Sequence, residues 1–321
     1  MTTLNNTTED LGSSATISES PFCMLSPKWQ NLKIFFIALN IPLSITAFLG
    51  NLLVITVLWK VRSSMCLHPS SKLLYSCLVF TDLCTGVITQ PLLVAFIFSP
   101  KHSKGCLYLQ IPYVLTSTIL RGVSVLTVTA ISVDRYLALV LRMRYRNMVT
   151  LTRIRTLLAV FTLYTVIGSM LWLYKFRIAA ALTAVTLLLC LLTASFCYLR
   201  IYLTLRNHQI QVQKRVFQPR EQKFQMNMAW YTRTVTSALW IQFTLLFCYL
   251  PFSTVIAIRA VIDVSNNPHA SAIDLAWYIT GVLFLSNSSI NPILYCWKIR
   301  GVRAGVKDII RQFCRFWILR G

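Results

Sequence analysis

Long apolar runs alternate with short polar segments along most of this chain. A helix that crosses a bilayer needs about 20 consecutive apolar residues. Seven runs of that kind are present: Ile34–Trp59, Leu73–Pro100, Gly105–Val133, Thr156–Tyr174, Ile178–Leu199, Thr234–Ile258 and Leu275–Trp297. A soluble helical core could imitate one or two such runs, but not seven. The pattern therefore predicts an all-α membrane protein built as a seven-transmembrane helix bundle.

Charge is rare in these runs. Five of them contain no Asp, Glu, Lys or Arg, and the other two contain one charge each, Asp82 in the second and Arg121 in the third. The whole chain is 56% hydrophobic and 12% charged, with a mean hydropathy of +0.62, whereas soluble chains have about 25% charged residues. Because a charge at mid-membrane is costly, Asp82 and Arg121 are candidates for function.

Basic residues gather in one set of connecting segments. By the predicted spans, 23 Lys and Arg residues fall between the first and second helices, between the third and fourth, between the fifth and sixth, and after the seventh; seven fall on the opposite side. Cytoplasmic segments carry the excess of Lys and Arg. We therefore expect the N-terminus outside and the C-terminus inside. This topology and anionic inner-leaflet lipids account for the net charge of +22 and no nucleic-acid partner is expected.

The ends of the chain differ from its middle. We expect a disordered extracellular tail over residues 1–30, a membrane domain over residues 31–298, and an amphipathic helix with a short cytoplasmic tail over residues 299–321. The first 30 residues show no apolar stretch behind a basic start, so the first helix is expected to act as the signal. Asn5 and Asn6 begin overlapping glycosylation sequons. Cys314 is either a palmitoylation site or an unmodified thiol.

The ten cysteines form no CxxC pair and no metal-binding spacing. Most of them fall within apolar runs, where cysteine acts as a small hydrophobic residue. Cys23 and Cys106 are the two that fall clearly outside the membrane on the oxidising side, so we predict a disulfide between them. The chain also contains no HExxH, GxxxxGK[ST] or GxSxG motif and no plausible acid–base pair of carboxylates within the membrane. An enzyme is therefore not expected.

Five short motifs occur in order, each on the expected helix. They are Gly50-Asn51, Asp82 in LVFTD, Asp134-Arg135-Tyr136, FCYLPF at 247–252 and NPILY at 291–295. Over roughly residues 30–315 the chain resembles the rhodopsin-like (class A) G-protein-coupled receptors. The resemblance implies a plasma-membrane receptor that binds an extracellular ligand and activates a heterotrimeric G protein, with no resident cofactor.

The resemblance also implies roles for individual residues. The residues that the resemblance implies for coupling to the G protein are Asp134, Arg135, Tyr136, Tyr198 and Tyr295. In the resting state Asp134 would pair with Arg135. Pro251 and Pro292 each remove a backbone hydrogen bond and kink their helices, so they are expected hinges. An allosteric sodium ion is implied at Asp82, Ser124, Asn287, Ser288 and Asn291; the alternative is a hydrogen-bonded polar network without an ion.

The chain departs from the family pattern at several positions. No cysteine lies between the fourth and fifth helices, and only Lys175-Phe176-Arg177 connects them. Cys190 replaces a common proline, and Tyr249 replaces the usual tryptophan of the sixth helix. The short connection and the missing proline are similar to the melanocortin, lysophospholipid, cannabinoid and adenosine branch. Ser117 occupies the place of the ammonium-binding aspartate of amine receptors, so an amine ligand is disfavoured.

Arg121 and Arg135 are 14 residues apart, which on an α-helix is 40° short of four full turns and about 21 Å of axial distance. They therefore share one face of the third helix. Arg135 would face the G protein, and Arg121 the floor of a ligand pocket. Candidate pocket residues are Ser117, Arg121, Tyr249, Arg177 and Arg259, and a ligand carboxylate or phosphate, from an acidic lipid or peptide, would meet Arg121. The alternatives are an internal Arg121–Asp82 pair, or water and carbonyl partners.

Two other functional classes fit seven helices. A transporter or channel would need paired charges along a path through the membrane, and Asp82 with Arg121 is the one candidate pair in the runs. A non-signalling member would act by dimerising or by handling lipids. Activation of a G protein in cells would separate both from a receptor.

Overall fold

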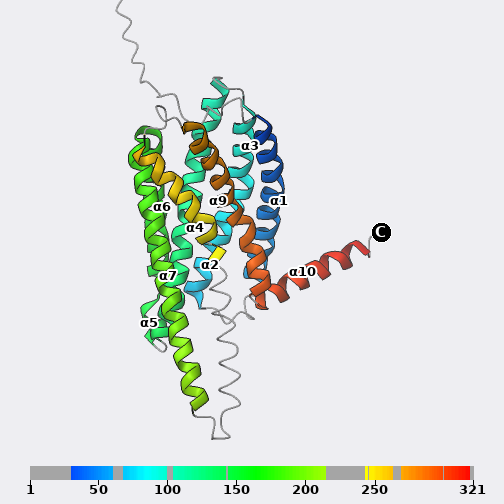
Figure 1. The fold of residues 1–321 in the computed structure, drawn as a ribbon. Coiled ribbons are helices and arrows are strands. Elements are labelled where there is room, and N and C mark those ends of the chain that lie inside the picture. The colour runs from blue at the N-terminus through cyan, green and yellow to red at the C-terminus, as the bar shows by residue number, and fades with distance from the viewer. Residues whose placement is uncertain are drawn as a thin grey trace, which may run out of the picture.

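Helices make up the bundle, and nearly all of them were expected from the apolar runs. The computed structural model describes residues 30–60, 68–99, 104–141, 144–214, 243–244, 246–262, 269–298 and 300–318. The helices are α1 (Gln30–Lys60), α2 (Pro69–Cys84), η3 (Thr85–Thr89), α3 (Gln90–Phe98), α4 (Lys104–Leu141), α5 (Tyr145–Met148), α6 (Leu151–Tyr174), α7 (Phe176–Lys214), the helix at Leu246–Val261, α9 (Ala270–Lys298) and α10 (Arg300–Ile318). Figure 1 shows them side by side, with α4 among the others. We call the end of the bundle next to α10 the lower end and the opposite end the upper end.

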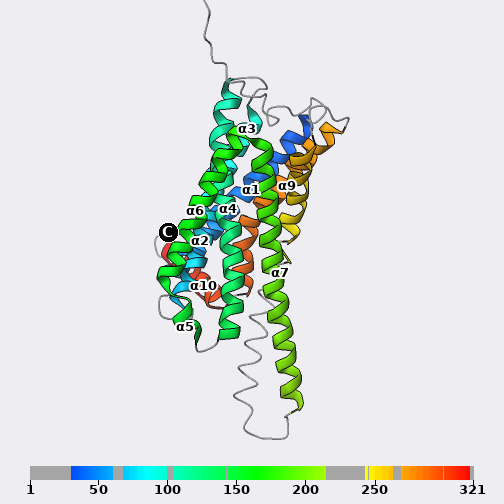
Figure 2. The same cartoon turned by 90° about the vertical axis from the view of Figure 1, so that its left-hand side faces the viewer.

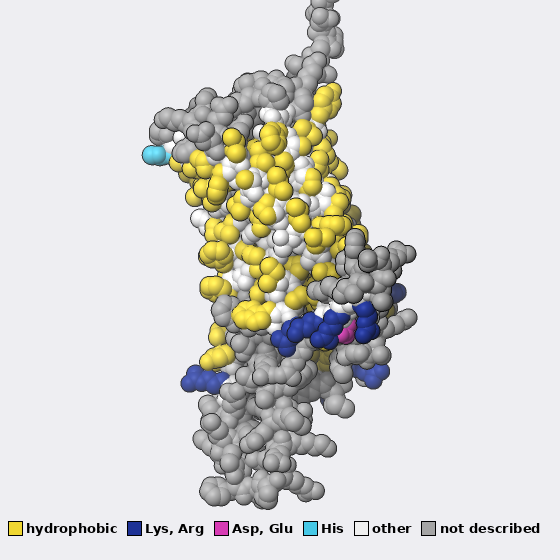
Figure 3. Space-filling model, turned by 90° about the vertical axis from the view of Figure 1, so that its right-hand side faces the viewer, with side chains coloured by type: hydrophobic (Ala, Val, Ile, Leu, Met, Phe, Trp, Pro, Cys, Tyr) yellow, Lys and Arg dark blue, Asp and Glu magenta, His cyan; other side chains and the backbone are white. Residues whose placement is uncertain are grey.

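The outer surface of the bundle is apolar. Within the described residues, five segments are long and apolar enough to cross a membrane: Ile34–Trp59, Pro69–Phe98, Tyr108–Leu141, Leu151–Tyr174 and Phe176–Thr204. The helix at Leu246–Val261 is apolar but shorter in its described part, and α9 has 29 residues. Figure 3 shows hydrophobic side chains covering the face of the bundle that lies to the right in Figure 1, with Lys and Arg gathered near its lower end. The molecule is a helical, multi-pass membrane protein.

The second predicted span is interrupted by a single π-helical turn that the apolar pattern did not indicate. In η3 the chain gains one residue per turn, and the N–H of Gln90 donates to the carbonyl of Thr85. Pro91 follows in the first turn of α3 and lacks an N–H group. On α1, Ser44 Oγ donates to the Gly86 carbonyl at 2.7 Å. A Cβ on Gly86 would lie 2.9 Å from that of Ala47, so glycine allows this close approach.

The connection between α6 and α7 is a single residue, Lys175. Two helices joined so tightly must run antiparallel and in contact, and Figure 1 shows them as neighbours. From this corner at the upper end, α7 runs the full depth of the bundle and continues beyond it at the lower end (Figure 2). The near absence of a connecting loop agrees with the prediction from the sequence.

The last helix, α10, leaves the lower end of the bundle at an angle (Figure 1). Its start packs against α1, where a Cβ on Gly305 would lie 2.6 Å from Val57, and Val302 is buried. Its exposed basic residues repeat every fourth position, which places them on one face; they are Arg303, Lys307, Arg311 and Arg315. One face of α10 is therefore strongly basic.

Candidate functional site

Asp82 is fully buried where α2, α4 and α9 meet. Its Oδ1 accepts from Ser288 Oγ at 2.8 Å and from Ser124 Oγ at 3.3 Å, and its Oδ2 accepts from Asn291 Nδ2 at 2.8 Å. A carboxylate inside a membrane needs such donors, because each unmet hydrogen bond there is costly. Four of the five residues implied for a sodium site are thus in direct contact. We call these four the Asp82 cluster.

Asn287, the fifth residue, makes a different contact. Its Nδ2 donates to the Tyr249 hydroxyl at 2.9 Å, which links α9 to the helix at Leu246–Val261. Its Oδ1 is buried and has no hydrogen-bond partner in the described part of the chain. Asn287 and Asn291 are four residues apart and so share a helix face. The oxygen of Asn287 is therefore an unsatisfied acceptor on the face that carries Asn291.

The Gly50-Asn51 pair holds α1 against this cluster. Asn51 is fully buried, and its Nδ2 donates to the Ser288 carbonyl at 2.9 Å and to the Ala47 carbonyl at 2.8 Å. A Cβ on Gly50 would lie 2.8 Å from the Cβ of Pro292. Glycine lets α1 approach the Pro292 ring, and the asparagine then joins the two backbones. Contact between α1 and α9 therefore explains both residues of the motif.

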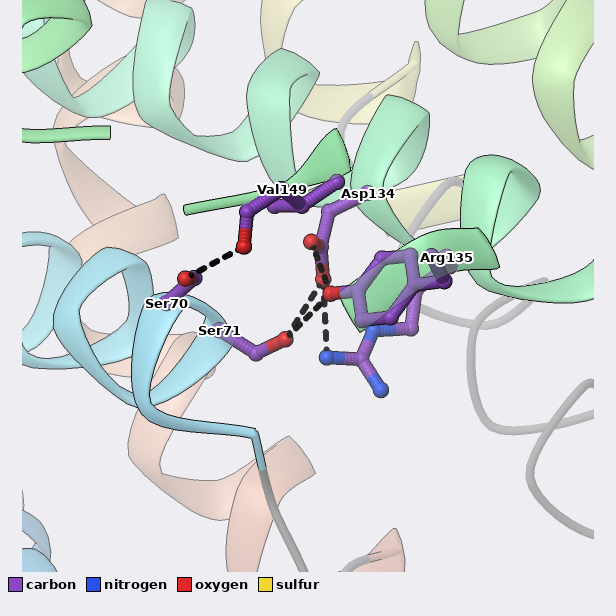
Figure 4. A network of polar contacts seen from close by, with 6 residues as sticks. Ser70, Ser71, Asp134, Arg135 and Val149 are labelled. Atoms are coloured by element: carbon purple, nitrogen blue, oxygen red, sulfur yellow. Dashed lines mark hydrogen bonds and ion pairs between the residues drawn. The ribbon is translucent and has the colours of Figure 1, made fainter. Parts of the chain in front are cut away.

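At the lower end, Asp134 is the centre of a second polar network (Figure 4). Arg135 Nη2 lies 2.9 Å from Asp134 Oδ2, and Ser71 Oγ donates to the same oxygen at 2.8 Å. The Tyr145 hydroxyl donates to Asp134 Oδ1 at 2.5 Å. Burial, and then the Asp134 carboxylate, raise the pKa of Tyr145 to about 12, so its hydroxyl stays a donor. We call Ser71, Asp134, Arg135 and Tyr145 the lower network; sequence reasoning named two of the four.

The remaining residues implied for coupling lie close to this network. Arg135 lies over the Tyr75 ring, with its guanidinium carbon 5.8 Å from the centroid, and Tyr75 contacts Tyr295 edge to face at 6.1 Å. Tyr198 and Tyr295 are both buried. Tyr136 contacts Phe196 of α7 at 6.3 Å. Pro251 lies inside the helix at Leu246–Val261 and Pro292 inside α9.

A cavity of about 220 Å³ lies in the upper half of the bundle. Its walls come from α4, α6, α7, α9 and the helix at Leu246–Val261, and Arg121 is the one ionisable group other than tyrosine among its lining residues. We call it the upper cavity. Of the five candidate pocket residues, Ser117 and Arg121 line it, whereas Tyr249, Arg177 and Arg259 do not.

Arg121 is held within this cavity with no carboxylate partner among the described residues. Its Nε donates to the Ser117 carbonyl at 3.0 Å, and its guanidinium carbon lies 5.1 Å from the centroid of Phe284 and 5.7 Å from that of Phe252. Aromatic faces attract a cation, by about 2 kcal/mol when desolvated. No ion pair joins Arg121 to Asp82 in the described residues, where the ion pairs found are Asp134–Arg135 and Arg259–Asp274.

Arg259 has an internal partner that the sequence analysis did not name. Its Nη1 lies 2.7 Å from Asp274 Oδ1, and its side chain is 2% exposed. Its guanidinium also lies over Trp277, 4.9 Å from the centroid, and over Phe176 at 5.8 Å. The expectation that Arg259 attracts a ligand at the rim does not match this buried arrangement. Asp274 gave no signal because it lies in no motif.

Several predicted sites fall outside the described residues. Asn5, Asn6 and Cys23 belong to residues 1–29, and only the backbone of Cys106 in α4 and of Cys314 in α10 is described. The glycosylation sites, the disulfide and the palmitoylation therefore stay predictions. Arg177 is exposed at the start of α7.

Comparison with known proteins agrees with this arrangement. The model of the family described as "7 transmembrane receptor (rhodopsin family)" matches residues 50–179 and 172–295. The adenosine receptor A3 of Ovis aries is 24% identical over 296 residues, which cover 83% of this chain and 86% of that receptor. The matched residues include α4 with both arginines, the Asp82 cluster and the lower network. The chain belongs to the rhodopsin family of seven-transmembrane receptors.

Proposed function

We propose that this chain is a plasma-membrane receptor that binds an acidic, non-amine ligand at Arg121 and activates a heterotrimeric G protein at its lower end. Signalling through a G protein and an extracellular ligand follow from the family. The upper end would be extracellular and the lower end cytoplasmic, because Lys and Arg gather at the lower end. The basic face of α10 would then meet anionic inner-leaflet lipids.

One observation carries the ligand part of this proposal. Arg121 lines the upper cavity with a carbonyl and two aromatic rings as partners. These partners stabilise the cation but leave its charge uncompensated, and a guanidinium presents five N–H donors in a fork that matches a carboxylate or phosphate. An anionic group is therefore the ligand chemistry that completes the site.

The signalling part rests on α4. The same helix carries Arg121 in the upper cavity and Arg135 in the lower network, about 21 Å apart. A ligand that shifts or rotates α4 at Arg121 would move Asp134 and Arg135 relative to Ser71 of α2 and Tyr145 of α5. Release of Arg135 from Asp134 would free it to face an inserted helix of the G protein, while Pro251 and Pro292 allow the neighbouring helices to bend.

We also propose that the Asp82 cluster binds sodium. The hydroxyl oxygens of Ser124 and Ser288 both contact the carboxylate of Asp82, and the buried oxygen of Asn287 needs a partner. Oxygen ligands suit a hard cation. The thermal stability of the purified receptor should rise with sodium chloride but not with choline chloride, and Asp82→Asn should remove that difference. Equal stability in both salts would favour the ion-free hydrogen-bonded network.

Nucleotide exchange on purified G proteins tests the receptor function. Membranes containing the receptor should exchange GTP faster than control membranes, and Arg135→Ala should remove the increase without loss of surface expression. The transporter alternative loses its one candidate pair, since Arg121 and Asp82 form no ion pair in the part of the chain that the structure describes. No exchange with any G-protein class, under a broad screen of ligands, would instead support the non-signalling alternative.

A further inference from the structure

A cluster of aromatic rings lies at the upper side of the upper cavity. Trp172 and Trp277 both line it, and their rings lie 6.0 Å apart. Phe176 contacts Trp172 at 5.2 Å. Arg259 lies over Trp277 and Phe176 and is held there by Asp274. We call these three rings and the Arg259–Asp274 ion pair the aromatic cap; Trp172 and Trp277 are its members that line the cavity.

The side of the cavity between α6 and α7 is different. Three of its lining residues there are large and lie at the outer surface: Ile167 is 55% exposed, and Tyr164 and Leu182 are each 45% exposed. In a membrane-spanning bundle, apolar surface at this depth contacts lipid chains. The same residues therefore border both the cavity and the bilayer.

Two glycines shape this side. A Cβ on Gly122 of α4 would lie 2.5 Å from Thr165 Cγ2, so glycine lets α4 and α6 approach closely beside Arg121. Gly168 lies on α6, one turn above Thr165, and a Cβ on Gly168 would have no atom within 4 Å. Close packing at Gly122 followed by open space at Gly168 leaves a gap in the α6 wall. We call Ile167, Gly168 and Leu182 the lateral window.

Polar contacts bridge α6 and α7 on either side of this gap. The Tyr164 hydroxyl and Thr186 Oγ1 are hydrogen-bonded at 2.5 Å, and Trp172 Nε1 donates to Thr183 Oγ1 at 3.3 Å. Tyr164 and Trp172 are eight residues apart, about 12 Å along α6, and Gly168 is midway between them. On α7 their partners, Thr183 and Thr186, are only one turn apart and directly follow Leu182, so the two bridges tie α6 to α7 beside the window.

We propose that the lateral window seats the apolar chain of an anionic single-chain amphiphile whose head group binds Arg121. This inference rests on the proposed function and specifies its ligand. The carboxylate or phosphate lies under the aromatic cap against Arg121, and the chain passes between α6 and α7 into the bilayer. The ligand reaches the site from the membrane, because the residues of the window border both the cavity and the lipid.

Photo-crosslinking tests this directly. The full-length receptor is purified into phosphatidylcholine nanodiscs and exposed to three probes that carry a diazirine in an oleoyl chain: oleate, oleoyl lysophosphatidate and the uncharged monoolein. Crosslinked residues are mapped by mass spectrometry. Both anionic probes should label the window residues at least tenfold more than monoolein does, and labelling by one anionic probe alone would distinguish a carboxylate from a phosphate head.

Four variants separate seating in the window from contact with surrounding lipid. Arg121→Gln and Gly168→Phe should each reduce anionic labelling of the window by tenfold or more. Gly168→Ala should label like the unmodified receptor, because one methyl group leaves the gap open. Leu163→Phe is the matched control, since Leu163 is 61% exposed on α6 and does not line the cavity. If Gly168→Phe does not fold, Leu182→Trp adds bulk to the α7 edge of the same window and should act alike.

The proposal would be overturned if monoolein labelled the window as strongly as the anionic probes, or if Arg121→Gln and Gly168→Phe left the labelling unchanged. Either result would mean that the probes had labelled the window from the surrounding lipid alone. Binding is measured without G protein. A receptor activated by some other acidic ligand would therefore fail this test and still catalyse exchange. A chain that binds the amphiphile but cannot signal would pass it and fail the exchange assay.

Discussion

Arg121 and Arg135 lie on one face of one helix, and they differ in what neutralises their charge. Arg135 has a carboxylate 2.9 Å away, and that carboxylate is also held by Ser71 and Tyr145. Arg121 has a backbone carbonyl and the faces of Phe252 and Phe284. The lower arginine is thus paired with an anion, whereas the upper one has no anionic partner among the described residues.

The difference follows from what each end of α4 must do. A charge-assisted pair that several groups support is stable until a competitor replaces it, which suits a resting contact that a G protein displaces. A cation that is stabilised only by dipoles and aromatic faces can persist in a membrane-embedded site, yet it gains further when an anion arrives. Under the proposed function, the G protein would break the lower network and the ligand would fill the upper cavity.

Arg135→Ala should have the largest effect, because it removes the group that faces the G protein. Hydrogen bonds to charged groups contribute about 1.5–3 kcal/mol, so exchange should fall by about 100-fold while the receptor still folds. Guanine-nucleotide exchange, normalised to surface expression, measures this. Arg146→Ala, an exposed arginine of α5, is the control. Normal exchange in Arg135→Ala would remove the functional contrast between the two arginines.

Gly122→Ala tests whether the packing beside Arg121 is as tight as the structure indicates. The added methyl group would meet Thr165 at 2.5 Å, and overpacking in a well-packed region costs about 1–3 kcal/mol. The melting temperature of the purified receptor should fall. Thr165→Ser removes the obstructing methyl group, so the double variant should recover part of the loss. A melting temperature that stays unchanged in Gly122→Ala would mean that α4 and α6 separate easily at this level.

Arg121→Gln should weaken binding of an acidic ligand by tenfold or more, since one charge-assisted hydrogen bond contributes about 1.5–3 kcal/mol. Affinity for a neutral analogue of the same ligand should change little. Unchanged potency would argue against an anion at Arg121. If the variant were poorly expressed and Asp82→Asn restored expression, Arg121 and Asp82 would be an internal pair in the membrane, contrary to their separate partners in the structure.

Helix positions could be predicted because a bilayer demands long apolar segments, and the expected spans agree with the described helices to within a few residues at most ends. The exceptions have physical causes. The π-helical turn at Thr85–Thr89 adds one residue to an otherwise regular apolar run, which leaves hydropathy unchanged. The third and fifth helices continue past the predicted Val133 and Leu199, because a helix that leaves the membrane becomes polar without ending.

Site residues could be predicted where they belong to a motif. They could not be predicted where an arginine or aspartate of the site pairs with a polar residue that lies outside every motif. Asp82, Ser124, Ser288 and Asn291 were all expected to be close together. Tyr145 and Asp274 were not, because a lone tyrosine in a basic loop and a lone aspartate at a helix start are usually solvent-exposed residues. Only the fold shows that Asp274 faces Arg259, and that Arg259 does not line the upper cavity.

Tyr145→Phe should have the smallest effect and the one most specific to the lower network. The hydroxyl supports Asp134, and so indirectly the pair with Arg135. Ser71 still donates to Asp134 in this variant, so the resting state should lose only about 1 kcal/mol, and basal exchange should rise about fivefold.

The pKa of Tyr145, raised to about 12 by burial and by Asp134, sets the pH dependence of this effect. A raised pKa favours the neutral hydroxyl in the folded state, so its contribution is fully present below the ordinary tyrosine pKa of about 10 and is lost only as pH rises through about 12. The ratio of basal exchange between Tyr145→Phe and the unmodified receptor should therefore be constant from about pH 6 to pH 9.

Basal exchange that falls in Tyr145→Phe would show that the hydroxyl serves the active state instead. A ratio that changes across this pH range would mean that another titrating group controls Asp134. Because Ser71→Ala removes the second donor to the same carboxylate, combining it with Tyr145→Phe should raise basal exchange further, and only if Asp134 restrains Arg135 at rest.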